Sequence, residues 1–171
     1  YNPPKGTVFI DGHDIFEIPL EVLRSHIGFV TQEPLLFSET IAENIAFGAP
    51  GLSEDKIEES ARLAEVHEEI ENFRKKYDTL LGERGVNISG GQKQRTTVAR
   101  ALAVDPSILI LDDALASVDT DTEEKILTRL KEVREHSTCL IISHRVSTVK
   151  DADKIVVLED GRITEVGTHE D

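Results

Sequence analysis

The chain has few positively charged residues for its length. Lys and Arg number 19 against 33 Asp and Glu over 171 residues, which gives a formal net charge of -14 at pH 7. Proteins that bind nucleic acid backbones usually carry a basic patch or stripe, and the sequence contains none. We therefore expect no nucleic acid partner. A nucleotide remains compatible with this charge, because backbone amides and a bound cation can meet its phosphates.

Cysteine and long apolar runs are also scarce. Cys139 is the single cysteine, so the chain has no internal disulfide framework, and its place in the apolar stretch TCLIIS predicts a small buried core residue. No run approaches the roughly 18 apolar residues that a membrane span needs, and the N-terminus has no signal-peptide pattern. If a membrane is involved, we expect another chain or segment to cross it.

A short apolar run is followed by two carboxylates. Ile108 to Leu111 precede the acidic pair Asp112 and Asp113. A continuous apolar run of this length is typical of a strand buried in a parallel sheet, whose C-terminal end delivers polar side chains to one edge. The sequence therefore predicts that both carboxylates lie at a ligand-facing edge.

Two further strands are expected to end at the same edge. Cys139 to Ile142 predicts a second buried strand, after which His144 would lie beside the acidic pair. The segment His26 to Thr31 reads as another strand and ends just before Gln32. Gln32 and His144 are thus candidates for the same ligand site as the two aspartates.

A glycine-rich helix start precedes the first of these strands. Ser89, Gly90, Gly91 and Gln92 form a capping pattern, in which a glutamine follows the serine by three residues. The helix that follows is expected to stop before Pro106. Because the first amides of a helix have no partner within it, this start could bind an anion.

The other patterns predict helices and a closing hairpin. Ser53 opens a single polar helix over SEDKIEESARLAEVHEEIENF, in which His67 is expected to be solvated and not a metal ligand. Thr120 to Glu123 repeats the capping-box pattern before another helix. Asp160 and Gly161 are the two-residue signal for a tight hairpin.

The order of these motifs resembles the nucleotide-binding domain of an ABC transporter over essentially the whole chain. The matching motifs are the Q-loop, the signature motif, the Walker B strand, the D-loop and the switch histidine of the H-loop. In the same order, they are Gln32 in VTQEPLLF, Ser89 to Gln92 in NISGGQKQR, Ile108 to Asp112, Ser117-Val118-Asp119, and His144.

The resemblance implies a fold and its division. The fold is α/β, a P-loop NTPase sheet of the ABC-ATPase type with helices, a small antiparallel β part and a helical insertion. Residues 1–51 would form the β part and the Q-loop, and residues 52–100 the helical insertion and the signature motif. Residues 101–171 would form the core with the Walker B strand, the D-loop and the H-loop.

The resemblance also implies ATP and Mg²⁺ as cofactors and assigns roles to residues. Asp112 and Gln32 would hold Mg²⁺, and Asp113, His144 and Gln32 would serve the hydrolysis of ATP. In the family, a signature motif contacts the nucleotide bound by the opposing subunit, a role that falls to Ser89, Gly90, Gly91 and Gln92. Asp119 would lie at the interface between the two subunits and couple the two sites.

Partners and location follow from the same resemblance. They are a second ABC ATP-binding domain, in a homodimer or heterodimer, and the transmembrane domains of the transporter, which place the chain at the cytoplasmic face of the cell membrane. The stretch TQEPLLFSETIAENIAFG is more similar to exporter half-transporters than to importer ATPases, which indicates multidrug- or lipid-type export. The surface that contacts the membrane domains is expected near Gln32 to Gly48.

Two alternatives remain open at this stage. One is a soluble ABC-type ATPase of DNA repair or translation, which long coiled-coil insertions or a basic face would favour, and the sequence has neither. The other is a non-catalytic fragment that acts only as an interaction module. The transported substrate is not encoded here, because the membrane domains select it.

Asp113 departs from the family pattern, which usually has glutamate after the Walker B aspartate. One methylene fewer draws the carboxylate back by about 1.5 Å. Heterodimeric exporters with one poorly hydrolysing site carry this aspartate, so our hypothesis is that the chain supplies the degenerate site's Walker B strand. The alternative is a working homodimer that tolerates aspartate.

The phosphate-binding loop of the Walker A motif is absent from the sequence. The pattern G-x-x-x-x-G-K-[ST] occurs nowhere in the 171 residues. In the family this loop and its strand precede the segment that starts this chain, so we expect a truncated domain that alone binds ATP weakly or not at all and hydrolyses none. The missing strand is also expected to leave unpaired edges beside the strands of Asp112 and His144.

Overall fold

A three-stranded parallel sheet forms the centre of the computed structural model, which describes residues 2–82, 87–133 and 137–170. Its strands, in spatial order, are β3 (Ile27–Val30), β4 (Ile108–Asp112) and β5 (Thr138–Ile142). Val30 pairs with Leu111, and Asp112 pairs with Ile142, so the carboxyl ends of all three strands meet at one edge. The α/β class and the three core strands are confirmed.

Two antiparallel hairpins accompany the sheet. One joins β1 (Phe9–Ile10) to β2 (His13–Asp14), and the other joins β6 (Ile155–Glu159) to β7 (Arg162–Gly167). The second turns at Asp160 and Gly161, with φ of 49° and 73°. A two-residue turn with positive φ at both positions matches the twist of the strands, so the predicted hairpin is confirmed.

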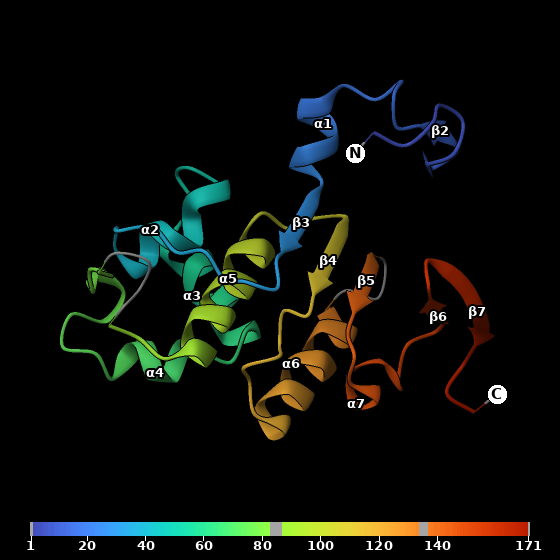
Figure 1. The fold of residues 1–171 in the computed structure, drawn as a ribbon. Coiled ribbons are helices and arrows are strands. Elements are labelled where there is room, and N and C mark those ends of the chain that lie inside the picture. Colours follow the sequence, from blue (N-terminus) through green and yellow to red (C-terminus); the bar gives the residue numbers. More distant parts are fainter. Residues whose placement is uncertain (1, 83–86, 134–136, 171) are drawn as a thin grey trace.

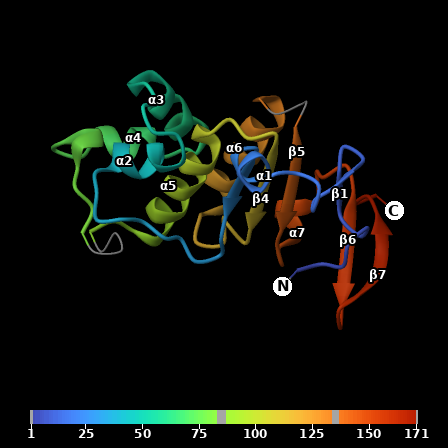
Figure 2. The same cartoon turned by 90° about the horizontal axis from the view of Figure 1, so that it is seen from above.

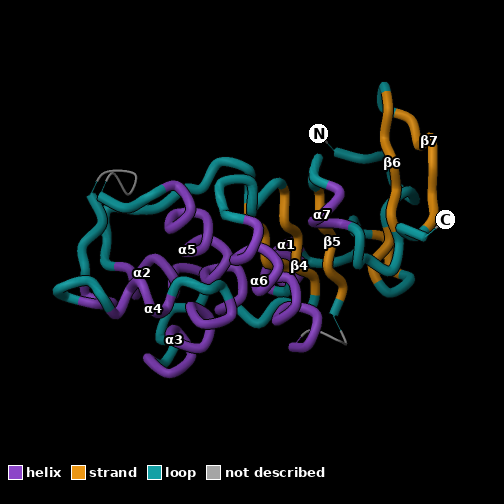
Figure 3. The backbone as a smooth tube through the Cα atoms, turned by 90° about the horizontal axis from the view of Figure 1, so that it is seen from below, coloured by secondary structure: helices purple, strands orange, loops and turns teal. Residues whose placement is uncertain are grey.

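The helices gather mainly on one side of the sheet, and the β6–β7 hairpin lies on the other (Figure 1, Figure 2). The helical group comprises α2 (Ile41–Ile45), η1 (Ala46–Gly48), α3 (Glu54–Leu63), α4 (His67–Glu71), η2 (Lys76–Asp78) and α5 (Gly90–Ala103). The others are α1 (Leu20–Ser25) before β3, α6 (Thr120–Val133) before β5 and α7 (Val146–Val149) after it. Figure 3, a view from below, shows the helical group and the β6–β7 hairpin on opposite sides of the sheet, with α1, α6 and α7 near its strands.

Local capping explains where several of these helices begin. Thr40 forms a complete capping box with Glu43 at the start of α2, and the Ser53 side chain accepts from the amide of Lys56 at the start of α3. The buried side chains of the helices and the sheet form one continuous core, which includes Ile45, Ile70, Val98, Leu109 and Ile126. No helix within the described ranges combines the length and the apolar character that crossing a bilayer requires.

The prediction of a single helix from Ser53 onward is wrong, because the chain turns at Glu65. This residue has a φ of 54°, and its amide donates to Arg62 while the next amide, of Val66, donates to Ala61. These two bonds form a Schellman motif, which ends α3 before α4 begins. The turn is also fixed from outside, since the Arg95 guanidinium donates to the Glu65 carbonyl oxygen.

His67 is likewise not a solvated residue. It is half-buried, and its Nδ1 lies 2.8 Å from the hydroxyl oxygen of Tyr77. Burial raises the pKa of Tyr77 to about 12. The pair packs η2 against the start of α4, which is a structural role.

Strand β5 differs from the prediction of a buried strand. Cys139 is exposed, and Leu140 and Ile142 are 51% and 46% exposed, because β5 lies at the edge of the sheet and no other strand of the described chain pairs with its outer side. The expected unpaired edge is therefore present beside the strand of His144. The strand of Asp112, β4, has no unpaired edge, since β3 and β5 lie on its two sides.

Candidate functional site

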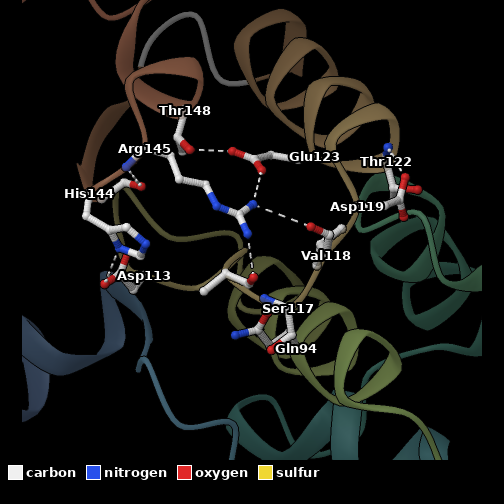
Figure 4. A network of polar contacts seen from close by, with 12 residues as sticks. Gln94, Asp113, Ser117, Val118, Asp119, Thr122, Glu123, His144, Arg145 and Thr148 are labelled. Carbon is white, nitrogen blue, oxygen red and sulfur yellow. Dashed lines mark hydrogen bonds and ion pairs between the residues drawn. The ribbon is translucent and has the colours of Figure 1, made fainter.

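Asp113 and His144 meet at the carboxyl edge of the sheet. Asp113 has a φ of 45°, and its amide donates to the Ile142 carbonyl oxygen at 2.9 Å, so the chain turns as soon as β4 ends. His144 Nδ1 lies 3.1 and 3.3 Å from the two oxygens of the Asp113 carboxylate (Figure 4). The histidine side chain is 70% exposed and the aspartate 17%. One ring nitrogen is thus held, and the ring itself is open to a ligand.

Asp112 and Gln32 lie at the same edge without joining this pair. Asp112 is the last residue of β4, and Gln32 follows the end of β3 by two residues, where it is exposed. In the described part of the chain, Gln32 has no hydrogen bond to Asp113 or His144. The loop that carries it is shaped by Thr31, whose hydroxyl donates to the Glu33 carbonyl oxygen at 2.7 Å.

The glycine-rich start of α5 has the capping box that the sequence predicts. The backbone amide of Gln92 donates to Ser89 Oγ at 3.1 Å, and the backbone amide of Ser89 donates to Gln92 Oε1 at 2.9 Å. The amides of Gly90 and Gly91 lie in the first turn, where a helix offers no acceptor of its own. With the helix dipole, this geometry suits an anion.

Glu69 of α4 fixes this helix start from the side. Its carboxylate accepts a hydrogen bond from Gln92 Nε2 and another from Arg95 Nη2, each at 2.6 Å. The side-chain amide of Gln92 therefore accepts the capping-box hydrogen bond with Oε1 and donates to Glu69 with Nε2. No local pattern singles out Glu69, because it is one of several glutamates in a polar segment.

The D-loop segment, residues 116–119, packs directly against the same helix start. A methyl group added at Gly91 would lie 3.1 Å from the Ser117 carbonyl oxygen, which is a tight contact, so this close approach favours glycine. From the next turn of α5, the buried Gln94 accepts a hydrogen bond from the Ser117 amide at 2.7 Å. The signature motif and the D-loop segment are therefore in contact, while Asp112 and Asp113 lie at the sheet edge.

Asp119 caps α6, which corrects the predicted capping box at Thr120 to Glu123. Asp119 Oδ1 accepts from the Thr122 amide at 3.0 Å, and this bond lowers the pKa of the exposed Asp119 carboxyl below its usual value. Glu123 cannot complete a box, because its carboxylate is buried and bound by Arg145 and Thr148. Both partners follow β5 and are more than twenty residues away in sequence.

The oxygen ligands at the edge fit a magnesium ion that is shared with a substrate. No group of three or more His, Cys, Asp or Glu side chains in the described ranges could hold a metal by itself. Mg²⁺ usually keeps several waters and is bound through one or two carboxylates together with substrate phosphates. Asp112 and Gln32 could supply such a partial set.

Comparisons with known proteins agree with the motif order and the fold. The profile of the family described as ABC transporter matches residues 1–116. The chain is 49% identical over 169 residues to an uncharacterized ABC transporter ATP-binding protein, YfiB, of Bacillus subtilis (strain 168), with 99% of the chain and 29% of the relative covered. It is 46% identical over 170 residues to the ATP-dependent lipid A-core flippase of Syntrophus aciditrophicus (strain SB), covering 99% and 28%.

A solved structure extends this likeness to three dimensions. The structure of a bacterial Atm1-family ABC exporter with ATP bound has a TM-score of 0.94 and 42% identity, covering 99% of this chain and 30% of that one. The chain thus spans under a third of the length of these relatives. The profile match over more than half of the chain, with the close agreement in fold, shows that it belongs to the ABC transporter family and has the ABC-ATPase fold.

Proposed function

We propose that this chain is the ATP-binding and ATP-hydrolysing part of an ABC exporter, of multidrug or lipid type. The observation that carries the proposal is the contact of Asp113 with His144 at the edge where Asp112 and Gln32 also lie. The names of the similar proteins, which include a lipid A-core flippase and an exporter, support the direction of transport.

The chemistry proposed for this site depends on positioning and charge. In phosphoryl transfer, nearly all catalysis comes from orienting the reactants and stabilising charge on the phosphoryl oxygens. Asp113 would orient the attacking water, and the exposed His144 ring, held through Nδ1, would present Nε2 to the γ-phosphate. Mg²⁺, held by Asp112 and Gln32, would offset charge on the β- and γ-phosphates when bound.

A second domain of the same kind would complete each nucleotide site. The Gly90 and Gly91 amides at the start of α5 would face the γ-phosphate bound by the opposing subunit, and Asp119 would lie at the interface. With aspartate at position 113, we propose a heterodimer in which this chain supplies the degenerate site's Walker B strand.

An aromatic cluster supports contact with transmembrane domains at the cytoplasmic face of a membrane. The Phe37 and Phe47 rings stack with their centroids 4.3 Å apart, and the Arg100 guanidinium lies 5.1 Å from the Phe37 centroid. Arg100 also donates to the carbonyl oxygens of Leu35 and Asn44, each at 2.7 Å. Burial lowers the pKa of Arg100 to about 10, so it stays charged at neutral pH. Leu35 and Phe47 remain exposed, as a docking surface requires.

The proposal is tested with the full-length parent transporter in lipid, together with its natural partner. Asp112→Asn is expected to lower the rate of ATP hydrolysis by on the order of a hundredfold, because a ligand of the metal that offsets phosphate charge is lost. Asp121→Asn, on the exposed face of α6, is the matched control and should leave the rate unchanged. Absence of ATP hydrolysis in the unmodified transporter, or equal rates in the two variants, would refute the proposal.

The 171-residue chain by itself is expected to bind ATP with a dissociation constant weaker than about 1 mM. Its sequence lacks the G-x-x-x-x-G-K-[ST] pattern whose amides and lysine cradle the phosphates. Isothermal titration with MgATP measures this directly. A micromolar affinity would show that the remaining residues suffice for binding.

A further inference from the structure

Arg145, next to the switch histidine, reaches the backbone of the D-loop segment. Its Nη2 donates to the Ala116 carbonyl oxygen at 2.6 Å, and its Nη1 lies 3.5 Å from that of Val118 (Figure 4). The two carbonyl groups lie on either side of Ser117. One guanidinium therefore binds one carbonyl group closely and a second weakly in a segment that is far from it in sequence.

A buried carboxylate sets the orientation of this guanidinium. Arg145 Nη1 also donates to Glu123 Oε2 at 2.8 Å, and the Glu123 side chain is only 3% exposed. The other oxygen of Glu123 accepts a hydrogen bond from the Thr148 hydroxyl. A buried charge is stable only when it is paired and hydrogen-bonded, so Glu123 and Arg145 hold each other in one geometry.

The D-loop segment is held from its other side by α5. The Ser117 amide donates to Gln94 Oε1, and the Ser117 carbonyl oxygen lies against Gly91. Arg145 thus contacts the carbonyl groups of Ala116 and Val118 on one side of the segment. Gln94 binds the amide of Ser117 on the other side. Displacement of the segment away from the signature helix would break the bond to Gln94, and displacement away from the H-loop would break those to Arg145.

We propose that Arg145 is a positioning residue that ties the H-loop to the D-loop, with Glu123 as the group that orients it. This inference rests on the proposed function, because it assigns Arg145 to the ATP hydrolysis of the intact transporter. His144 serves the chain's own nucleotide, and the signature helix serves the partner's. Through Arg145 and Gln94, the D-loop segment joins these two parts, which would hold Asp119 at the proposed interface.

The role requires arginine and not merely a positive charge. A guanidinium donates in several directions within one plane, whereas an ammonium group is a single point charge. Lysine at position 145 could keep the ion pair with Glu123, but its three N–H groups leave from one nitrogen atom and do not reproduce the spread of the two terminal guanidinium nitrogens over Glu123, Ala116 and Val118. Arg145→Lys therefore separates the charge from the positioning contacts.

The test measures ATP hydrolysis by the full-length transporter with its natural partner. Arg145→Lys is expected to lower kcat by on the order of tenfold to a hundredfold, as displacement of catalytic groups by about 1 Å does, while KM for ATP stays within about twofold. Glu123→Gln, which keeps the shape of the side chain, should lower kcat in the same way but less. Thermal unfolding of each variant is recorded alongside.

The matched control is Arg129→Lys, on α6 with Glu123. Arg129 also pairs with a glutamate, Glu65, at 2.7 Å and donates to a carbonyl oxygen, that of Arg62, but lies away from the D-loop segment. The kcat of the Arg129→Lys transporter should equal that of the unmodified transporter. Equal kcat in the Arg145→Lys and Arg129→Lys variants overturns the inference, as does failure of both Arg145→Lys and Glu123→Gln to assemble, which would make the contact structural. If the unmodified transporter hydrolyses no ATP, the proposed function fails instead.

Discussion

Asp113→Glu in the full-length transporter, assayed beside its natural partner, is expected to raise ATP turnover by on the order of tenfold to a hundredfold. Both oxygens of the Asp113 carboxylate are close to His144 Nδ1, at 3.1 and 3.3 Å. Glutamate lengthens the side chain by one methylene, which extends the reach of the carboxylate by about 1.5 Å. A displacement of about 1 Å at a reacting group is enough for a change of this size.

The control for this gain is the same lengthening at the adjacent residue. Asp112→Glu adds one methylene to a carboxylate on the regular end of β4, where it would disturb the proposed Mg²⁺ contact, and it should lower turnover. If Asp113→Glu gives no gain, the degenerate-site hypothesis is wrong. A homodimer that tolerates aspartate would then be the better explanation.

Gly28→Ala is expected to lower the free energy of unfolding of the chain by about 3 kcal/mol. A methyl group at Gly28 would lie 2.6 Å from the Ala101 carbonyl oxygen, 2.8 Å from Pro106 Cγ and 3.2 Å from Leu109 Cδ1. The first two belong to backbone and to a proline ring, which cannot rotate away. Relief would require α5 to move off β3, and this would displace the strand that leads into the Gln32 loop.

Urea denaturation followed by circular dichroism measures this loss, with Gly82→Ala as the matched control. Among the described residues, the nearest atom to a methyl group added at Gly82 is Asn87 Oδ1 at 3.8 Å, so the substitution should change stability by less than about 0.5 kcal/mol. Equal unfolding midpoints for the two variants would mean that the contact between α5 and β3 adjusts at little cost.

The sequence predicted the sheet edge because the signals for it are local. The apolar run before Asp112 and Asp113, and the polar residues after the neighbouring strands, are each visible within a few residues. The rule that parallel strands end at a common edge then brings Gln32 and His144 to the same side. The capping box of Ser89 and Gln92 was predictable for the same reason.

Long-range contacts account for what the sequence did not indicate. Glu123 has the spacing of a capping-box residue, but Arg145 and Thr148 bind it, and Asp119 caps the helix instead. The turn at Glu65 has a positive φ but no glycine that would indicate it in the sequence. The Arg95 guanidinium, from α5, donates to the Glu65 carbonyl oxygen at this turn. In both cases a guanidinium from another element binds groups that a local pattern assigns elsewhere.

The exposure of Cys139 was missed for a different reason. An apolar stretch predicts that a strand is apolar, but not that both of its faces and edges are covered. β5 is the outer strand of the described sheet, so its apolar residues lie partly in solvent. Position within the sheet, which one sequence does not contain, decided the outcome.

The pairing of β3 with β4 also has a consequence for the order of folding. Ile27 pairs with Ile108, and the entire helical group from α2 to α5 lies between them in the chain. Closing so long a loop costs entropy that only the finished strand pair repays. Helices of this group, which depend on near-neighbour contacts, can form first and shorten the effective loop. We expect the helical group to act as the folding nucleus, and the sheet edge that carries Asp113 and His144 to be completed last.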